Sequence, residues 1–204
     1  MNNPAIGADA DAHPSRPDAV RAPLLASLLD TGDPPRRRVI ADLGALQRGL
    51  LDTISGTPTR LLIVDLPERR RQGICAWEQV TGALPGEFWR EPVDAVLCWD
   101  LLNYLDVERL AALAASLRER AAPGCRVHAL IHYSALEMPE QPAGIRVDTD
   151  RSLQIPGGSG TGFVAAPRYS PKTLEKAMPS LTIDRSMLLG NGMREFVFKL
   201  RASN

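Results

Sequence analysis

Two apolar stretches near the start of the chain have the pattern of buried strands, and a segment with helical spacing joins them. The first, Val39 to Ala41, ends in Asp42-Leu43-Gly44, and the second, Leu61 to Val64, ends in Asp65. A glycine permits a sharp turn from a strand into a helix, whose first amides are free to bind a polar ligand. This order of elements predicts the first half of a nucleotide-binding α/β unit, in which an acid about 20 residues past the loop binds a ribose.

The same alternation returns after Val93. Asp94 to Trp99 has the pattern of a buried strand, and a short turn from Asp100 to Leu105 follows it. The stretch from Val107 to Ala122 carries leucines on one helical face, and Arg126 to Tyr133 is again strand-like. Strands that alternate with helices predict a parallel sheet with right-handed crossovers.

Polar residues stand where these predicted strands end. They are Asp42, Asp65, Asp100 and Tyr133. Ligands of parallel sheets bind beyond the carboxyl ends of the strands. The sequence therefore predicts a binding site at this edge of the sheet.

The two ends of the chain have other patterns. Residues 1–18 read as a disordered leader, and residues 19–204 as a single domain with a leading helix at 19–35 and an α/β core at 36–204. In this interpretation Asp18 caps the leading helix, which packs on the sheet or covers a pocket. Ser170-Pro171 starts a helix that continues to about Met178.

Two final strands surround a turn signal, Gly190-Asn191-Gly192. They run from Leu181 to Leu189 and from Glu195 to Leu200, which predicts an antiparallel pair. Pro67 to Pro92 has no clear pattern beyond a short strand near Ile74 to Trp77.

Charge and cysteine content narrow the class of protein. Lys plus Arg and Asp plus Glu number 24 each, so no basic field favours nucleic acid. No apolar run reaches the ~20 residues that span a bilayer, and no secretory signal begins the chain. The three cysteines, Cys75, Cys98 and Cys125, lack CxxC spacing. We expect a cytoplasmic protein without a disulfide framework, a metal site or a membrane partner.

Over residues 36–201 the chain resembles the class I S-adenosylmethionine-dependent methyltransferases. The resemblance is carried by Val39 to Gly44, Ile63 to Leu66, Asp94 to Leu105, the turn Pro123-Gly124 and the terminal hairpin. Residues 98–105 (CWDLLNYL) and the tail from Arg168 to Leu200 are similar to a proteobacterial methyltransferase-like family with no assigned substrate. The resemblance implies a Rossmann-like α/β three-layer sandwich, with a mostly parallel seven-stranded sheet that ends in an antiparallel hairpin strand.

The resemblance also implies a cofactor site and catalytic residues. S-adenosylmethionine would contact Asp42, Gly44, Ala45, Asp65, Leu66, Trp99 and Asp100. Asp65 would hold the ribose, and Trp99 and Asp100 would flank the methyl-donor side. Asn103, Tyr104 or His132 would position or deprotonate the methyl acceptor. Leu46 and Arg48 stand where this superfamily usually has further loop glycines, and their side chains are expected to obstruct the approach of the ligand.

Several of these residues also have a structural interpretation. Asp42 could have no role beyond capping the turn that follows it, and Asp100 could be an N-cap. Tyr104 could be an aromatic residue at the edge of the core. His128 and His132 lie on one strand face and could be packing residues, with His132 the better general base.

The glycine run from Gly157 to Gly162 lacks the Gly-Lys-Ser/Thr ending of a phosphate loop, and is interpreted as a flexible flap over the pocket.

Two functions remain open from the sequence. One is methyl transfer to an N or O nucleophile of a small molecule or protein. The other is a catalytically inactive methyltransferase-fold module that binds a protein partner, using the edge at Arg69 to Arg71 and the flap at Gly157 to Gly162. A nicotinamide-dependent oxidoreductase would need a GxGxxG turn, which the sequence lacks.

Overall fold

The computed structural model describes residues 19–30, 36–45, 47–73, 91–142, 144–156 and 162–201. The predicted leader, the short strand near Ile74 to Trp77 and most of the glycine run lie outside these residues. No helix in the described ranges is long and apolar enough to cross a membrane.

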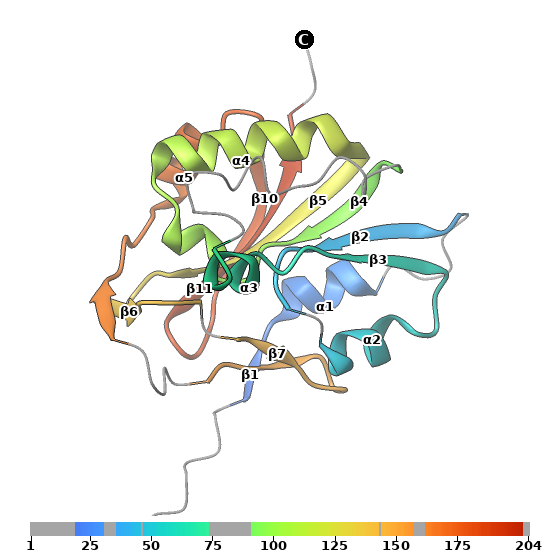
Figure 1. Cartoon of the computed structure of the whole chain (residues 1–204), viewed down its shortest axis with the longest axis horizontal. Helices are drawn as coiled ribbons and strands as arrows, with labels where there is room; N and C mark the ends of the chain where they lie inside the picture. The colour runs from blue at the N-terminus through green and yellow to red at the C-terminus, as the bar shows by residue number, and fades with distance from the viewer. Residues whose placement is uncertain are drawn as a thin grey trace, which may run out of the picture.

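A mixed sheet forms the centre of the structure (Figure 1). Its strand order is β10-β11-β5-β4-β2-β3. The strands are β2 (Arg38–Asp42), β3 (Thr59–Ile63), β4 (Val93–Leu97), β5 (Ala121–His132), β10 (Leu181–Leu188) and β11 (Met193–Leu200). β3, β2, β4 and β5 pair in parallel, whereas β11 is antiparallel to both β5 and β10. The sequence predicts seven mostly parallel strands, and the six-stranded mixed sheet in the described ranges corrects that prediction.

Helices cover both faces of the sheet, as Figure 1 shows. α4 (Val107–Arg120) and α5 (Pro171–Ala177) lie on one face, and α1 (Pro23–Leu29) and α2 (Arg48–Ile54) on the other. Each face has its own apolar core. One core contains Leu110 and Phe198, and the other contains Leu25 and Leu97. Two further helices, α3 (Leu66–Arg71) and the 3₁₀ helix η2 (Leu101–Tyr104), follow β3 and β4.

Local sequence signals account for the helix ends that were predicted. The Ser170 side chain accepts a hydrogen bond from the Thr173 amide, and Pro171 occupies the first helical position of α5. Asp106 caps α4 in the same way through the Arg109 amide. The leading helix, by contrast, begins at Pro23 rather than after Asp18.

Two small sheets were not predicted. Residues 19–21 form a strand of the first small sheet instead of helix, so the leading helix starts at Pro23 and not at residue 19. The first sheet has the order β1-β8-β7 and the second pairs β6 with β9. Their strands are β1 (Ala19–Arg21), β6 (Glu137–Pro139), β7 (Arg146–Val147), β8 (Ser152–Gln154) and β9 (Phe163–Ala165). Strands of two or three residues are too short for a period-2 pattern.

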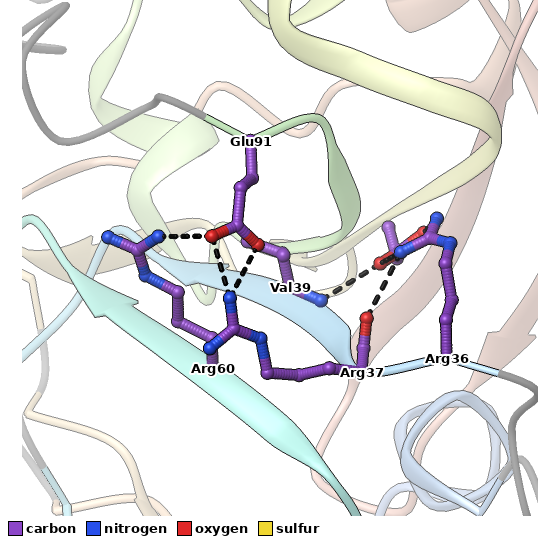
Figure 2. A network of polar contacts seen from close by, with 6 residues as sticks. Arg36, Arg37, Val39, Arg60 and Glu91 are labelled. Carbon is purple, nitrogen blue, oxygen red and sulfur yellow. Dashed lines mark hydrogen bonds and ion pairs between the residues drawn. The ribbon is translucent and has the colours of Figure 1, made fainter.

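The amino-terminal edge of the sheet is held by ion pairs. Figure 2 shows Arg37 and Arg60 reaching one carboxylate, Glu91, with 2.7 Å between the closest N and O atoms of each pair. Asp94 binds the Arg36 guanidinium and accepts a hydrogen bond from the Val39 amide at 2.8 Å. The arginine run before β2 therefore joins the amino ends of three strands, at the edge opposite the predicted site.

A buried carboxylate attaches α1 to the sheet. Glu195 of β11 has no exposed surface. It accepts hydrogen bonds from the first-turn amides of Leu24 at 3.1 Å and Leu25 at 2.6 Å. Its Oε1 also lies 3.0 Å from Nε2 of His128, which is likewise buried. Since the first amides of a helix have no partner within the helix, Glu195 supplies acceptors that α1 lacks.

Replacing Glu195 tests this attachment. Glu195→Ala leaves two amides and an imidazole buried without an acceptor, so we expect the free energy of unfolding to fall by about 3–5 kcal/mol. Glu195→Gln keeps one acceptor oxygen, so its free energy of unfolding should fall by less. Urea denaturation of the three proteins measures both effects. A loss below about 1 kcal/mol for Glu195→Ala would contradict this account.

Candidate functional site

Three acids follow three neighbouring strands. β3, β2 and β4 lie side by side in parallel, and Asp65, Asp42 and Asp100 stand at or just after their carboxyl ends. The sequence predicts this placement at one edge of the sheet. The environments of the three carboxyl groups nevertheless differ, and they determine what each group is able to do.

Asp42 is a buried anchor rather than an exposed acid at a strand end. Its Oδ1 accepts hydrogen bonds from the Gly44 amide at 2.8 Å and from Trp99 Nε1 at 2.5 Å. Its Oδ2 is buried without a hydrogen-bond partner among the described residues. Burial raises the pKa of Asp42 to about 6, and the two hydrogen bonds oppose that rise.

Trp99 lies directly against the loop after β2. A Cβ placed on Gly44 would lie 2.6 Å from Trp99 Cδ1, so only glycine fits at this position. Trp99 has a φ of 50°, an uncommon left-handed conformation for a non-glycine residue. Its ring meets His128 edge-on, with centroids 6.2 Å apart. The side chain is therefore fixed between the loop and the centre of the sheet.

A cavity of ≈ 680 Å³ opens beside this loop, within the usual size range of small-molecule sites. One wall comes from the ends of β2 and β4 and the start of α2. Another part of the wall is a segment that we name the lid, residues 142 and 144–149. The lining residues are Gly44, Ala45, Gln47, Arg48, Gly49, Asp52, Pro67, Trp99, Asp100, Leu101, Pro142, Gly144, Ile145, Arg146, Val147, Asp148 and Thr149.

Among the described residues, a hydrogen bond and a close backbone contact join the lid to α2. The Val147 amide donates to Gln47 Oε1 at 2.9 Å. A Cβ on Gly49 would lie 1.6 Å from the Val147 carbonyl oxygen, so the two backbones pack closely only because Gly49 has no side chain. These contacts could not be predicted from the sequence, because the partners are about 100 positions apart.

A second cavity of ≈ 510 Å³ shares Ala45, Pro67 and Pro142 with the first. Asp65 lines it together with residues of α3. The Asp65 side chain accepts a hydrogen bond from the Glu68 amide at 3.2 Å and so caps α3. This cap is a structural role that the sequence did not reveal, since α3 itself was not predicted.

The structure does not place the three predicted catalytic residues in the wall of the larger cavity. The Asn103 side chain donates to the carbonyl oxygens of Asp100 and Leu130 and accepts from the His132 amide, which joins η2 to β5. The Tyr104 hydroxyl lies 3.0 Å from the Pro139 carbonyl oxygen, and burial raises its pKa. Their catalytic roles stay predictions.

Of the two histidines of β5, His128 is fully buried and His132 is half-buried. His132 Nε2 is buried without a hydrogen-bond partner among the described residues, and burial lowers the pKa of this imidazole. His128 contacts Glu195, so it packs within the core as its structural interpretation had it.

The remaining features raised by the sequence are Arg48 and Leu46 of the loop, the N-cap role of Asp100 and metal ligation. The side chain of Arg48 is 95% exposed, so it does not fill the loop after β2. Leu46 lies outside the described residues. Asp100 is buried at the N-cap position of η2, but its side chain makes no capping hydrogen bond. Among the described residues, no group of three or more His, Cys, Asp or Glu side chains could hold a metal ion.

Comparison with known proteins identifies the fold. No family model matches the sequence, and a search of curated proteins finds no match. Similar solved structures include an S-adenosylmethionine-dependent methyltransferase from Clostridium acetobutylicum ATCC 824, with a TM-score of 0.50, 14% identity, and 81% of this chain and 85% of that chain covered.

Two further structures are similar at the same level. A complex of DhpI with SAH has a TM-score of 0.52 and 17% identity, with 89% of this chain and 82% of that chain covered. A structure from work on the conversion of a disulfide bond into a thioacetal group during echinomycin biosynthesis has a TM-score of 0.50, 17% identity, and coverages of 90% and 83%. At these identities the likeness shows the fold, which is that of the S-adenosylmethionine-dependent methyltransferases.

The raised pKa of Asp42 predicts a dependence of stability on pH. The carboxyl group has an ordinary pKa of 3.8 in the unfolded chain and about 6 in the folded protein, so the folded state holds the proton more tightly. This contribution to stability is fully present below pH 3.8 and is lost as the pH rises through 6. We expect it to amount to about 3 kcal/mol. Urea denaturation at several pH values should show the fall for the wild type and a weaker one for Asp42→Asn. Equal pH profiles would refute the assignment.

Gly49 provides a test of the lid. Alanine favours a helix over glycine by about 1 kcal/mol, yet Gly49→Ala should destabilise the protein by about 1–3 kcal/mol because its methyl group meets the Val147 carbonyl. Gly56→Ala is the matched control, because nothing lies within 4 Å of a Cβ there. Denaturant unfolding compares the two variants. An unchanged or raised stability for Gly49→Ala would show that the lid does not pack on α2.

Proposed function

We propose that this protein binds S-adenosylmethionine in the two adjoining cavities and transfers its methyl group to an N or O nucleophile. The observation that carries the proposal is the ≈ 680 Å³ cavity against Gly44, Trp99 and Asp100. It opens beside β2, which lies between β3 and β4 in the sheet. The connection from β2 leads to β3 at one side, and the connection from β4 leads to β5 at the other. In open α/β sheets this switch point is the usual ligand site.

The residues around the cavities fit such a ligand. Gly44 has no side chain, so its backbone borders the larger cavity directly. Asp65 borders the second cavity and accepts one hydrogen bond from the α3 amide, so its remaining acceptor capacity suits a ribose diol. Ala45 and Pro67 line both cavities, which suits a ligand that extends from Asp65 toward Trp99.

Methyl transfer of this kind requires positioning more than acid–base chemistry. When bound, S-adenosylmethionine supplies an electrophilic methyl group on its sulfonium. In the proposal, Trp99 and Asp100 border that group, and the lid covers the acceptor and excludes water. Asn103 holds the Asp100 carbonyl oxygen at 2.8 Å and thereby supports the cavity wall. Correct alignment of the reactants accounts for a large part of the barrier reduction in such reactions.

The size of the cavity favours a small molecule as the acceptor. The lid, Trp99 and Asp100 line the same space of ≈ 680 Å³, so an acceptor has to fit within that volume. A cytoplasmic location belongs to the same proposal, and the buried free thiols of Cys98 and Cys125 are consistent with a reducing compartment. The resemblance of residues 98–105 to the proteobacterial methyltransferase-like family supports the proposed methyltransferase function as well.

A second candidate function is a catalytically inactive module that binds a partner. The contact of Trp99 with Gly44 favours it, because the indole takes up space beside the loop. Exposed apolar side chains on and beside the β6–β9 pair also favour it, namely Leu136, Phe163 and Val164. If this candidate is right, the folded protein binds neither S-adenosylmethionine nor S-adenosylhomocysteine.

Ligand binding separates the two candidates. At 100 times its dissociation constant, S-adenosylhomocysteine should stabilise the purified protein by ~2.7 kcal/mol, measured by thermal denaturation. Asp65→Asn keeps an acceptor for the α3 cap but removes the charge, so binding should weaken about tenfold in calorimetry.

Asp106→Asn is the matched control. Asp106 caps α4 with the same hydrogen bond but lines neither proposed cofactor cavity, so its replacement should leave the affinity unchanged. A folded wild type that shows no shift with millimolar ligand would reject the proposal in favour of the partner-binding module.

A further inference from the structure

The lid belongs to a small sheet that also contains β1. β7 carries the lid residues Arg146 and Val147 and pairs with β8, and β8 pairs with β1 on its other side (Figure 1). In the described ranges this small sheet shares no strand with the main sheet. The lid therefore takes its position from the elements that hold β7 and β8, and β1 is one of them.

β1 is itself fixed to the main sheet through α1. We name residues 19–30, which comprise β1, α1 and the residue after the helix, the strap. Within it, only Ala22 separates the end of β1 from Pro23, the first residue of α1. The first turn of α1 is bound by the buried carboxylate of Glu195 in β11. A strand joined so directly to an anchored helix has little freedom to shift.

An apolar contact and an ion pair join the strap to the hairpin of β7 and β8. Val20 lies opposite Leu153 of β8, and both belong with Val147 to the same buried apolar core. At the turn of the hairpin, an Arg151 guanidinium nitrogen lies 3.2 Å from a carboxylate oxygen of Asp30. Arg151 has a φ of 64°, a conformation that glycine adopts more easily. The turn thus carries a charged side chain that reaches the strap where glycine would suit the backbone better.

The pairing of β1 with β8 depends largely on one side chain. Val20 is buried, whereas its neighbours Ala19 and Arg21 in the same strand are exposed. Short strands with few buried apolar contacts open at a lower free energy than the central strands of a sheet. Release of β1 from β8 is therefore an easier event than unfolding of the main sheet.

We propose that the strap holds the lid over the larger cavity and thereby determines how long a small ligand stays bound there. This role rests on the proposed function and adds control of the site by residues that line neither cavity. When β1 leaves β8, the lid keeps its hydrogen bond to Gln47 but loses its support through β8, and the cavity opens.

Hydrogen exchange of the full-length protein tests the strap without any ligand. Val20→Ala removes two methyl groups from the contact with Leu153, so the amides of residues 146–154 should exchange about 5- to 30-fold faster. Val127→Ala is the matched control, because it makes the same truncation at a buried position of the other apolar core. It should lower the stability of the whole protein but leave exchange at 146–154 unchanged, since those amides exchange through local opening.

Asp30→Asn tests the second contact of the strap and leaves the apolar core intact. The replacement keeps the shape of the side chain and removes the charge that faces Arg151. Because this ion pair is partly exposed to water, the amides of residues 146–154 should exchange only about 1.5- to 5-fold faster.

Release of a ligand tests what the strap does for the cavity. In stopped-flow experiments S-adenosylhomocysteine should dissociate about 3- to 30-fold faster from Val20→Ala than from the wild type. Val127→Ala should release it at the wild-type rate. If Val20 only stabilised the fold, both variants would unfold more easily and neither would release the ligand faster.

The outcomes separate the role of the strap from the function on which it rests. If residues 146–154 exchange at the wild-type rate in Val20→Ala, the strap does not hold the lid. If exchange rises but release of the ligand does not, the strap does not control the cavity, and the cofactor site stands. If the folded wild type binds no S-adenosylhomocysteine, the proposed function and the control by the strap both fail. If Val20→Ala does not fold, Asp30→Asn decides through the same two measurements.

Discussion

The site depends on how the buried carboxyl group of Asp42 is stabilised. A carboxylate at the end of a central strand is costly unless donors reach it. The fold supplies the Gly44 amide and the Trp99 indole, and both bind the same oxygen. These two bonds join the loop after β2 to Trp99, whose φ of 50° is left-handed. The wall of the larger cavity is therefore a consequence of burying one acid.

A second buried acid performs a comparable task at the other end of the same apolar core. Glu195 binds the first turn of α1 and His128, and the His128 ring contacts Trp99 edge-on. A continuous series of contacts thus extends from the leading helix through Glu195, His128 and Trp99 to Asp42. Each member is almost fully buried, so a change at one position alters the packing of the next.

Patterns that depend on neighbouring residues could be read from the sequence. The capped helices α4 and α5 and the terminal hairpin were predicted because their signals lie within a few positions. The alignment of Asp42, Asp65 and Asp100 also followed, since parallel strands end at one edge. The lid and the role of Glu195 could not be predicted, because their contacts join residues about 70 to 170 positions apart. The hydrogen bonds of Asn103 could not be predicted either, because its place in the sequence does not show that its amide is used within the fold.

The position of Trp99 bears on the choice between an enzyme and an inactive module. If the indole only filled the space beside Gly44, it would replace the ligand, and little volume would be left next to it. A cavity of ≈ 680 Å³ nevertheless persists along Trp99, Asp100 and the lid. The lid also needs Gly49 to approach α2, and its Ile145 and Val147 pack in the apolar core on that face of the main sheet. A cavity of this size, bordered by buried polar groups and by the lid, supports the proposed small-molecule ligand over a scaffold alone.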